Sequence, residues 1–263
     1  MKTLRIYRLL VASSIRSRMQ YKFNFWFSSA MSAFISAVEF AMLAVILHKF
    51  GHIQGWSLTE SGYLYAVLHL GRTIYRTFAS DVHHLEKYLV SGDLDGLLLR
   101  PIPVLLGLMT LNVSIRIGEL VQGLAILIWS LHGLIASGQI GFAALPLTFI
   151  AIVSGAALMF GIGLATASVG FWITRIEVLQ NITEDAARTA AQYPLTIYPK
   201  WMQGLLLGII PIAFANYMPA LYILRGQGGW WLVAASALIA LLALAAGMAL
   251  WRVGLSRYQS TGS

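Results

Sequence analysis

Long apolar runs follow one another along most of this chain, and they constrain its fold more than any other feature. Several approach the length of about 20 residues that crosses a bilayer as a helix. Only 11% of the residues are charged and 58% are hydrophobic, whereas soluble domains carry about 25% charged residues. We therefore predict a single all-α membrane domain over residues 1–263, with six transmembrane helices at about residues 23–47, 61–79, 104–135, 147–173, 201–224 and 230–251.

The positive residues are distributed unevenly between the two sides of the predicted bilayer. Cytoplasmic segments of membrane proteins carry an excess of Lys and Arg. With the N-terminus inside, only Lys49 and Arg225 fall in outer segments, and Arg116 lies within a span. The other Lys and Arg residues fall in inner segments or their flanks: Lys2, Arg5, Arg8, Arg16, Arg18, Lys22, Arg72, Arg76, Lys87, Arg100, Arg175, Arg188, Lys200, Arg252 and Arg257. This pattern predicts an N-in, C-in orientation and accounts for the net charge of +8 without a nucleic-acid partner.

Residues 1–22 carry several basic residues and no acidic residue. On a helical wheel Ile6 and Leu10 lie on one side, while Arg5 and Arg16 lie on another. This arrangement is typical of an amphipathic interfacial helix, which here would lie on the cytoplasmic leaflet and be attracted to anionic lipid. The alternative is a basic flank that only fixes the orientation of the first span.

Catalytic and metal-binding patterns are missing from the sequence. It contains no cysteine, which excludes thiolate metal sites and cysteine nucleophiles. HExxH, GxSxG and P-loop motifs are also missing. His83 and His84 are adjacent, so they would face different directions on a helix. We therefore expect no enzymatic activity and no cofactor bound by this chain.

A few polar residues fall inside the predicted spans. Asn112, Arg116, Glu119 and Gly123 follow one another at spacings that place them on one face of a continuous third span. Glu39 lies about as deep in the first span as Arg116 lies in the third. A charge at this depth costs at least about 2.5–3.5 kcal/mol unless it is paired or hydrated. Asn112, Arg116, Glu119 and Glu39 therefore either line a translocation path or include a structural Arg116–Glu119 ion pair.

Residues 80–103 form a charged segment between the second and third apolar runs. Ser80 or Asp81 is a candidate N-cap for a short helix over 81–90, and Gly92 would end this helix in the left-handed conformation. Asp93 or Asp95 would then cap a helix that starts near residue 97. These features predict an exposed knob, which either docks a soluble protein or is a plain interfacial loop. Residues 174–200 form a second charged segment, which we also expect on the cytoplasmic side.

The charged segment also carries a resemblance to a known family. The motifs GDLD (92–95) and LLRP (98–101) follow two spans, and YPL (193–195), IYP (197–199), PIAF (211–214) and NYMPA (216–220) come later. In this order the motifs resemble the permease subunits of ABC-2-type ABC transporters. The resemblance is greatest to the branch in which paired permeases work beside a separate ATPase. It extends over nearly the whole chain, but it does not specify the transported cargo.

The resemblance implies a bacterial plasma-membrane permease of an exporter, which dimerises with an identical or related permease. Two cytoplasmic ATPase subunits would bind ATP and Mg²⁺ and drive transport. Residues 81–100 would form the coupling helix, and Glu86, Asp93, Asp95 and Arg100 are candidates for the ATPase contact. In family members short re-entrant helices often lie between the fifth and sixth spans, and Pro211 and Pro219 interrupt the apolar run there.

Two other classes of function fit the same residues. One is a membrane scaffold or insertase that does not transport, in which the knob recruits a different soluble protein. The other is an ion-coupled carrier that uses Glu39, Arg116 and Glu119 and follows an ion gradient without ATP.

Overall fold

The computed structural model describes residues 2–50, 52, 54–113, 115–173 and 175–259, and this part of the chain is helical with no strand. The side chains of residues 2–6, 8, 15, 18, 50 and 185–187 lie outside the description. The longer helices are α1 (Lys2–Met19), α2 (Lys22–Phe50), α3 (Leu58–His83), α7 (Ile117–Ala136), α8 (Ala144–Ser168), α9 (Glu177–Ala191) and α12 (Trp231–Arg257). The shorter ones are α4 (Leu85–Ser91), α5 (Asp93–Leu98), α6 (Val104–Leu111), η1 (Val169–Phe171), η2 (Leu195–Ile197), α10 (Lys200–Gly204), η3 (Leu205–Ile209), η4 (Ile212–Ala215) and α11 (Tyr217–Arg225).

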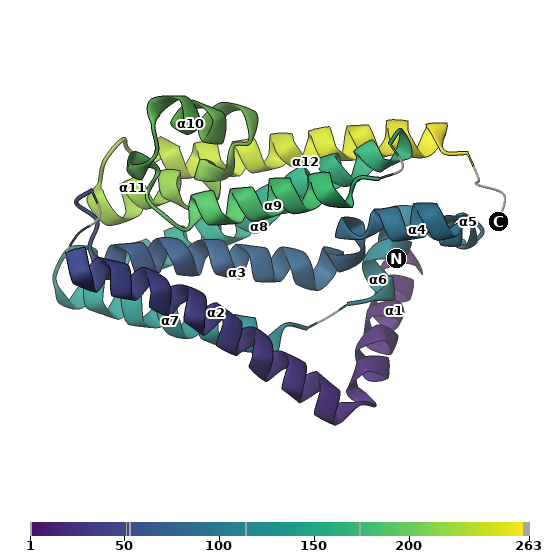
Figure 1. Cartoon of the computed structure of the whole chain (residues 1–263), viewed down its shortest axis with the longest axis horizontal. Helices are drawn as coiled ribbons and strands as arrows, with labels where there is room; N and C mark the ends of the chain where they lie inside the picture. Colours follow the sequence, from purple (N-terminus) through teal and green to yellow (C-terminus); the bar gives the residue numbers. More distant parts are fainter. Residues whose placement is uncertain (1, 51, 53, 114, 174, 260–263) are drawn as a thin grey trace.

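The long helices run side by side, and the short ones gather at the two ends of the bundle (Figure 1). α3, α7, α8, α9 and α12 run lengthwise, and α2 crosses them obliquely. α4, α5 and α6 lie at one end, near the start of α1 and the end of α12. α10 and α11 lie at the opposite end. The described ends of the chain and the predicted knob therefore share one end of the molecule.

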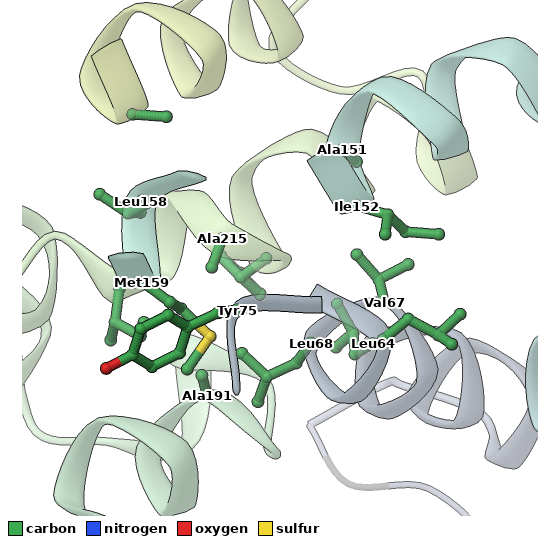
Figure 2. Close-up of a cluster of buried hydrophobic side chains, with 14 of the residues drawn as sticks. Leu64, Val67, Leu68, Tyr75, Ala151, Ile152, Leu158, Met159, Ala191 and Ala215 are labelled. Atoms are coloured by element: carbon green, nitrogen blue, oxygen red, sulfur yellow. The ribbon is translucent and has the colours of Figure 1, made fainter. Parts of the chain in front are cut away.

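α3 is the central helix of the bundle. It packs between α7 and α8, and most of its residues are buried. Ser57 and Glu60 begin it with a capping box, in which each side chain bonds to the other residue's backbone N–H. Figure 2 shows part of the core that it forms with neighbouring helices. The labelled side chains are Leu64, Val67, Leu68, Tyr75, Ala151, Ile152, Leu158, Met159, Ala191 and Ala215.

α8 and α12 pack along their length at very close range. A Cβ at Gly161 would lie 2.5 Å from the backbone carbon of Ala243, and one at Gly247 would lie 2.7 Å from the Gly161 carbonyl oxygen. Both glycines therefore let the two backbones touch. Lipid supplies little hydrophobic drive between helices, so small residues that permit such contact stabilise the pair through van der Waals packing.

An all-helical membrane fold agrees with the sequence prediction. In the part of the chain that the structure describes, four helices are long and apolar enough to cross a membrane: Lys22–Lys49, Ile117–Ala136, Ala144–Phe171 and Trp231–Arg257. α3 is also long, but it carries Glu60, Arg72, Arg76 and Asp81. The four helices correspond to the predicted first, fourth and sixth spans and to the later part of the third.

The predicted third span over 104–135 is not one helix. α6 ends at Leu111 and α7 begins at Ile117. Two residues between them have non-helical backbone: Asn112 has φ −131° and ψ 52°, and Arg116 has φ −90° and ψ 65°. Asn112 therefore does not share a helical face with Arg116, and the prediction of one polar face was wrong. A side chain of α1 bonds to the interrupted backbone, since Ser14 Oγ donates to the Leu111 carbonyl (3.2 Å) and accepts from the Val113 N–H (3.1 Å).

The predicted fifth span over 201–224 is also divided. It consists of α10, the π-helical turn η3, the 3-10 turn η4 and α11, and Pro211 lies between η3 and η4. Proline has no N–H to donate and cannot continue a helix without a break. The preceding charged segment, in contrast, contains α9, which packs against α3 and α8. The sequence pattern did not anticipate that a charged helix would lie within the bundle.

Candidate functional site

α3 and α9 meet through a cluster of charged side chains, which we call the α3–α9 cluster: Arg72, Arg76, His83 and Glu184. One carboxylate oxygen of Glu184 lies 3.0 Å from Arg76 Nε and 3.5 Å from Arg72 Nε, and the other lies 2.8 Å from His83 Nδ1. All four side chains are largely buried. Removal of one partner from a buried ion pair leaves an uncompensated charge. Glu184 therefore makes it possible for two arginines to lie inside the bundle.

A second ion pair joins α9 to α2. Arg188 Nη1 lies 2.7 Å from Glu39 Oε1, and both side chains are about one quarter exposed, at 27% and 25%. Glu184 and Arg188 are four residues apart, so they lie on the same side of α9. The opposite side carries Val178 and Ile182, which are exposed. α9 is thus an amphipathic helix whose charged side contacts its neighbours within the chain.

A third polar contact joins α7 to α3. Arg116 Nη1 lies 2.6 Å from Glu119 Oε1, as the i,i+3 spacing allows. Glu119 Oε2 accepts a hydrogen bond from Thr73 Oγ1 (3.4 Å), and His69 Nε2 lies 3.1 Å from the Glu119 carbonyl oxygen. Glu39 pairs with Arg188 instead. The structure therefore brings Arg116 and Glu119 together and places Glu39 in a different contact.

Sequence reasoning missed Arg72, Arg76, Glu184 and Arg188 as site residues and assigned them only to the cytoplasmic flanks. A signal was available. Arg72 and Arg76 are spaced by four residues, as are Glu184 and Arg188, so each pair lies on one side of its helix. Charged residues that share one side of a helix in an apolar chain need oppositely charged partners, so Glu184 was a candidate partner for Arg72 and Arg76.

An ion pair between Glu60 and Arg225 lies at the opposite end of α3. Arg225 at the end of α11 bonds to both carboxylate oxygens of Glu60, at 2.9 and 3.0 Å. Its guanidinium also lies 4.0 Å from the centre of the Trp56 ring, which adds a cation–π contribution. Gln139 donates to the same carboxylate (3.0 Å). This contact fixes α11 and the α7–α8 loop to the start of α3.

Within the charged segment, residues 85–100 form a knob made of α4, α5 and the two residues that follow α5. Gly92 ends α4 in the left-handed conformation with φ 75°, as the sequence predicts. Asp93 and Asp95 lie within the first turn of α5 and do not cap a later helix, so the predicted cap near residue 97 was wrong. The two carboxylates still interact favourably with the positive end of the helix dipole at the start of α5. Ser80 and Asp81 lie within α3, which kinks at Ala79, so neither caps α4.

α4 is bonded to two other parts of the chain. Glu86 Oε2 accepts hydrogen bonds from the backbone N–H groups of Ile176 (2.7 Å) and Glu177 (2.5 Å), and it thereby satisfies the first turn of α9. Tyr88 OH accepts a hydrogen bond from Asn112 Nδ2 (3.3 Å) at the α6–α7 break. Burial and the nearby Asp81 carboxylate raise the pKa of the Tyr88 hydroxyl to about 12. The knob is therefore connected to α9 and to the interrupted third apolar run.

The tip of the knob is exposed and mixed in character. Leu99 is 87% exposed and Val90 is 58% exposed, while Asp93 and Arg100 are also exposed. Ser91 Oγ donates to Asp93 Oδ2 (2.7 Å). Apolar side chains exposed beside charges are typical of a surface that contacts another protein. Among the described residues no group of three His, Asp or Glu side chains is positioned to hold a metal ion.

The apolar bundle, with its charged internal contacts and its knob, defines an integral membrane protein of the multi-helix class. Residues 33–262 match the family described as ABC-2 family transporter protein. The chain belongs to this family and is a membrane component of a transporter. Comparison with the curated proteins and with the solved structures finds no match.

Proposed function

We propose that the chain is the membrane-spanning permease subunit of an ATP-driven exporter in the bacterial inner membrane. It dimerises with a second permease, identical or related, and the translocation path lies at the seam between them. Two ABC ATPase subunits bind ATP and Mg²⁺ and dock at the knob. The knob, α1 and the end of α12 face the cytoplasm, where α1 lies on the lipid surface. Membership of the ABC-2 family supports this assignment.

The observation that carries the proposal is the exposed knob at the end of the bundle that also holds the described chain ends (Figure 1). Leu99 would enter an apolar depression on the ATPase, while Asp93, Asp95 and Arg100 would form charged contacts around it. Burial of an exposed leucine contributes about 1.5–3 kcal/mol, and the charges would set specificity and orientation. Glu86 is engaged with α9 inside the chain, so we assign it a transmitting role.

Coupling then follows the contacts of α4. Closure of the ATPase subunits on ATP displaces the knob, because α4 and α5 are short and lie at the end of the bundle. Glu86 passes the displacement to the first turn of α9, and Tyr88 passes it to Asn112 at the α6–α7 break. α9 is bound to α3 and α2 by ion pairs, which can exchange partners. Movement of α9 relative to α2 and α3 would open the seam.

A pull-down from the native host tests this proposal. The tagged wild-type chain should retain an ATP-binding-cassette ATPase. Asp93→Lys combined with Arg100→Glu should lower the retained ATPase by at least about tenfold, since loss of about 1.4 kcal/mol of binding has this effect. Glu86→Gln should keep the ATPase but reduce ATP-dependent transport. Gln227→Lys, at an exposed position after α11 at the opposite end of the bundle, is the control and should retain the ATPase. Absence of any ATPase from the wild-type sample would overturn the proposal.

The ion-coupled carrier remains the contrasting function, and its three residues give a direct comparison. Glu39 pairs with Arg188, whereas Arg116 pairs with Glu119, so the three do not form one contact group. Transport in proteoliposomes that follows an ion gradient without ATP and without the ATPase would favour the carrier and contradict the proposal.

A further inference from the structure

We propose that a cleft between α1, α2 and the α6–α7 break binds the phosphate group of an anionic membrane lipid. The cleft has a volume of about 490 Å³. Ser17 from α1 and Arg116 from the break belong to its polar lining. The first turns of α2 supply the rest of this lining: Asn24, Ser28, Ser29 and Ser32. This inference does not depend on the ATPase, and it goes beyond the proposed transport function.

The walls of the cleft are held in place by contacts outside it. α1 is fixed to the break by Ser14, which bonds to both Leu111 and Val113. α2 approaches α7 so closely at Gly118 that a Cβ there would clash with the Ser29 carbonyl. The cleft therefore lies between two anchored helices and is part of the fold.

The lining suits a phosphate group. Serine hydroxyls and the Asn24 amide supply donors, and none of the described residues that line the cleft is acidic. Arg116 supplies the charge: Nη1 contacts Glu119, and the side chain remains 30% exposed. A guanidinium has five N–H donors in a planar fork, which matches the oxygens of a phosphate. Glu119 does not line the cleft, so it can orient the guanidinium while other N–H groups face the ligand.

The surroundings of the cleft favour a lipid over a free phosphate ion. Phe23, Trp26 and Phe27 lie on the same turns of α2 and are exposed, and Tyr21 and Phe25 line the cleft itself. Acyl chains could follow this apolar surface of α2, which belongs to a candidate membrane span.

Positive charge at the same corner adds attraction for an anionic headgroup. Arg16 near the end of α1 and Lys22 at the start of α2 are exposed. Basic residues near an anionic membrane surface attract its headgroups. Together with Arg116, they offset the negative charge of Glu119 and select an anionic over a zwitterionic lipid.

Native mass spectrometry of the purified chain, combined with its thermal unfolding, tests the inference. Phosphatidylglycerol, phosphatidylcholine and inorganic phosphate are added separately to the protein in detergent. Phosphatidylglycerol should bind and raise the unfolding temperature. Phosphatidylcholine should bind about tenfold more weakly, because it lacks the net charge that Arg16, Lys22 and Arg116 attract. Inorganic phosphate should leave the unfolding temperature unchanged, because it has no acyl chain.

Variants locate the bound lipid. Arg116→Gln should lower phosphatidylglycerol binding by about tenfold, the effect of losing one charge-assisted contact. That change also removes the ion-pair partner of Glu119. Asn24→Leu combined with Ser28→Val leaves the ion pair intact and should likewise lower phosphatidylglycerol binding. Ser256→Val, on the exposed surface near the end of α12, is the control and should bind as the wild type does. Equal binding by the cleft variants, or equal stabilisation by inorganic phosphate, would overturn the inference.

Discussion

The two sides of the bundle are held together by different means. α8 and α12 contact each other through small residues, and their backbones touch at Gly161 and Gly247. α9 contacts α3 and α2 through ion pairs centred on Glu184 and Arg188. One contact is apolar and tightly interlocked, whereas the other is charged and partly open to its surroundings. Both solve the same problem, which is the lack of a hydrophobic drive between helices in lipid.

The difference indicates which side of the bundle moves. Interlocked backbones have one good arrangement, because a shift of either helix produces steric overlap. In the α3–α9 cluster one carboxylate contacts three basic side chains, so α9 can shift while Glu184 keeps at least one of them as a partner. The knob is bonded through Glu86 to α9, which is on the charged side. We therefore expect the α8–α12 pair to serve as a fixed frame and α9 to respond to the knob.

Loss of the shared acid should produce the largest effect. Glu184→Gln leaves Arg72 and Arg76 without a counter-charge, and we expect it to lower the free energy of unfolding by about 3 kcal/mol. Thermal unfolding in detergent or denaturant titration measures the change. Glu177→Gln makes the same substitution on an exposed position of α9 and should have little effect. If the two variants are equally stable, the ion pairs do not hold α9.

An added methyl group at the frame should produce the next largest effect. Gly161→Ala forces α8 and α12 apart, since the new Cβ would lie 2.5 Å from a backbone atom of Ala243. Overpacking of this kind costs about 1–3 kcal/mol. Gly204→Ala is the matched control, because a Cβ there meets nothing within 4 Å. Equal unfolding temperatures for these two variants would show that the backbones have room to separate.

The smallest effect is expected where α1 meets the break. Ser14→Ala removes the hydroxyl that bonds to Leu111 and Val113. It should lower the free energy of unfolding, since one such hydrogen bond contributes about 1 kcal/mol. Thermal unfolding checks the change in stability, and Ser13→Ala, an exposed neighbour on α1, is the control. The same variant should also weaken phosphatidylglycerol binding, because α1 forms one wall of the cleft. A Ser14 variant that matches the Ser13 variant in both measurements would contradict the assigned contact.

Local chemistry made part of the fold predictable from the sequence. The left-handed conformation of Gly92 and the start of α6 after Pro103 each depend on the residue itself and its nearest neighbours. The break at 112–116 was not predictable in this way, because a side chain from α1 satisfies its backbone. The place of α9 was missed for a similar reason: its charges are neutralised by α3 and α2, which are distant in sequence.

The site residues show the same difference between local contacts and contacts with residues distant in sequence. Arg116 and Glu119 are three positions apart, so their contact is readable from helical spacing. Glu39 was grouped with them by its depth in the membrane, but its partner Arg188 lies in a segment that hydropathy assigns to the loops. Glu86 was expected at the partner surface, whereas it bonds within the chain. Depth along a span therefore does not specify which neighbour a charge will meet.

Thiol labelling of the knob tests the central claim most directly, because the chain has no cysteine of its own. Leu99→Cys and Gln227→Cys each introduce a single thiol at an exposed position, at the knob and in the loop between α11 and α12 respectively. With a membrane-impermeant maleimide, the Leu99 variant should be labelled only in inside-out vesicles, and the bound ATPase should protect it. The Gln227 variant should be labelled in intact cells. Labelling of the Leu99 variant from outside, or equal labelling with and without the ATPase, would contradict a knob that couples this chain to ATP hydrolysis.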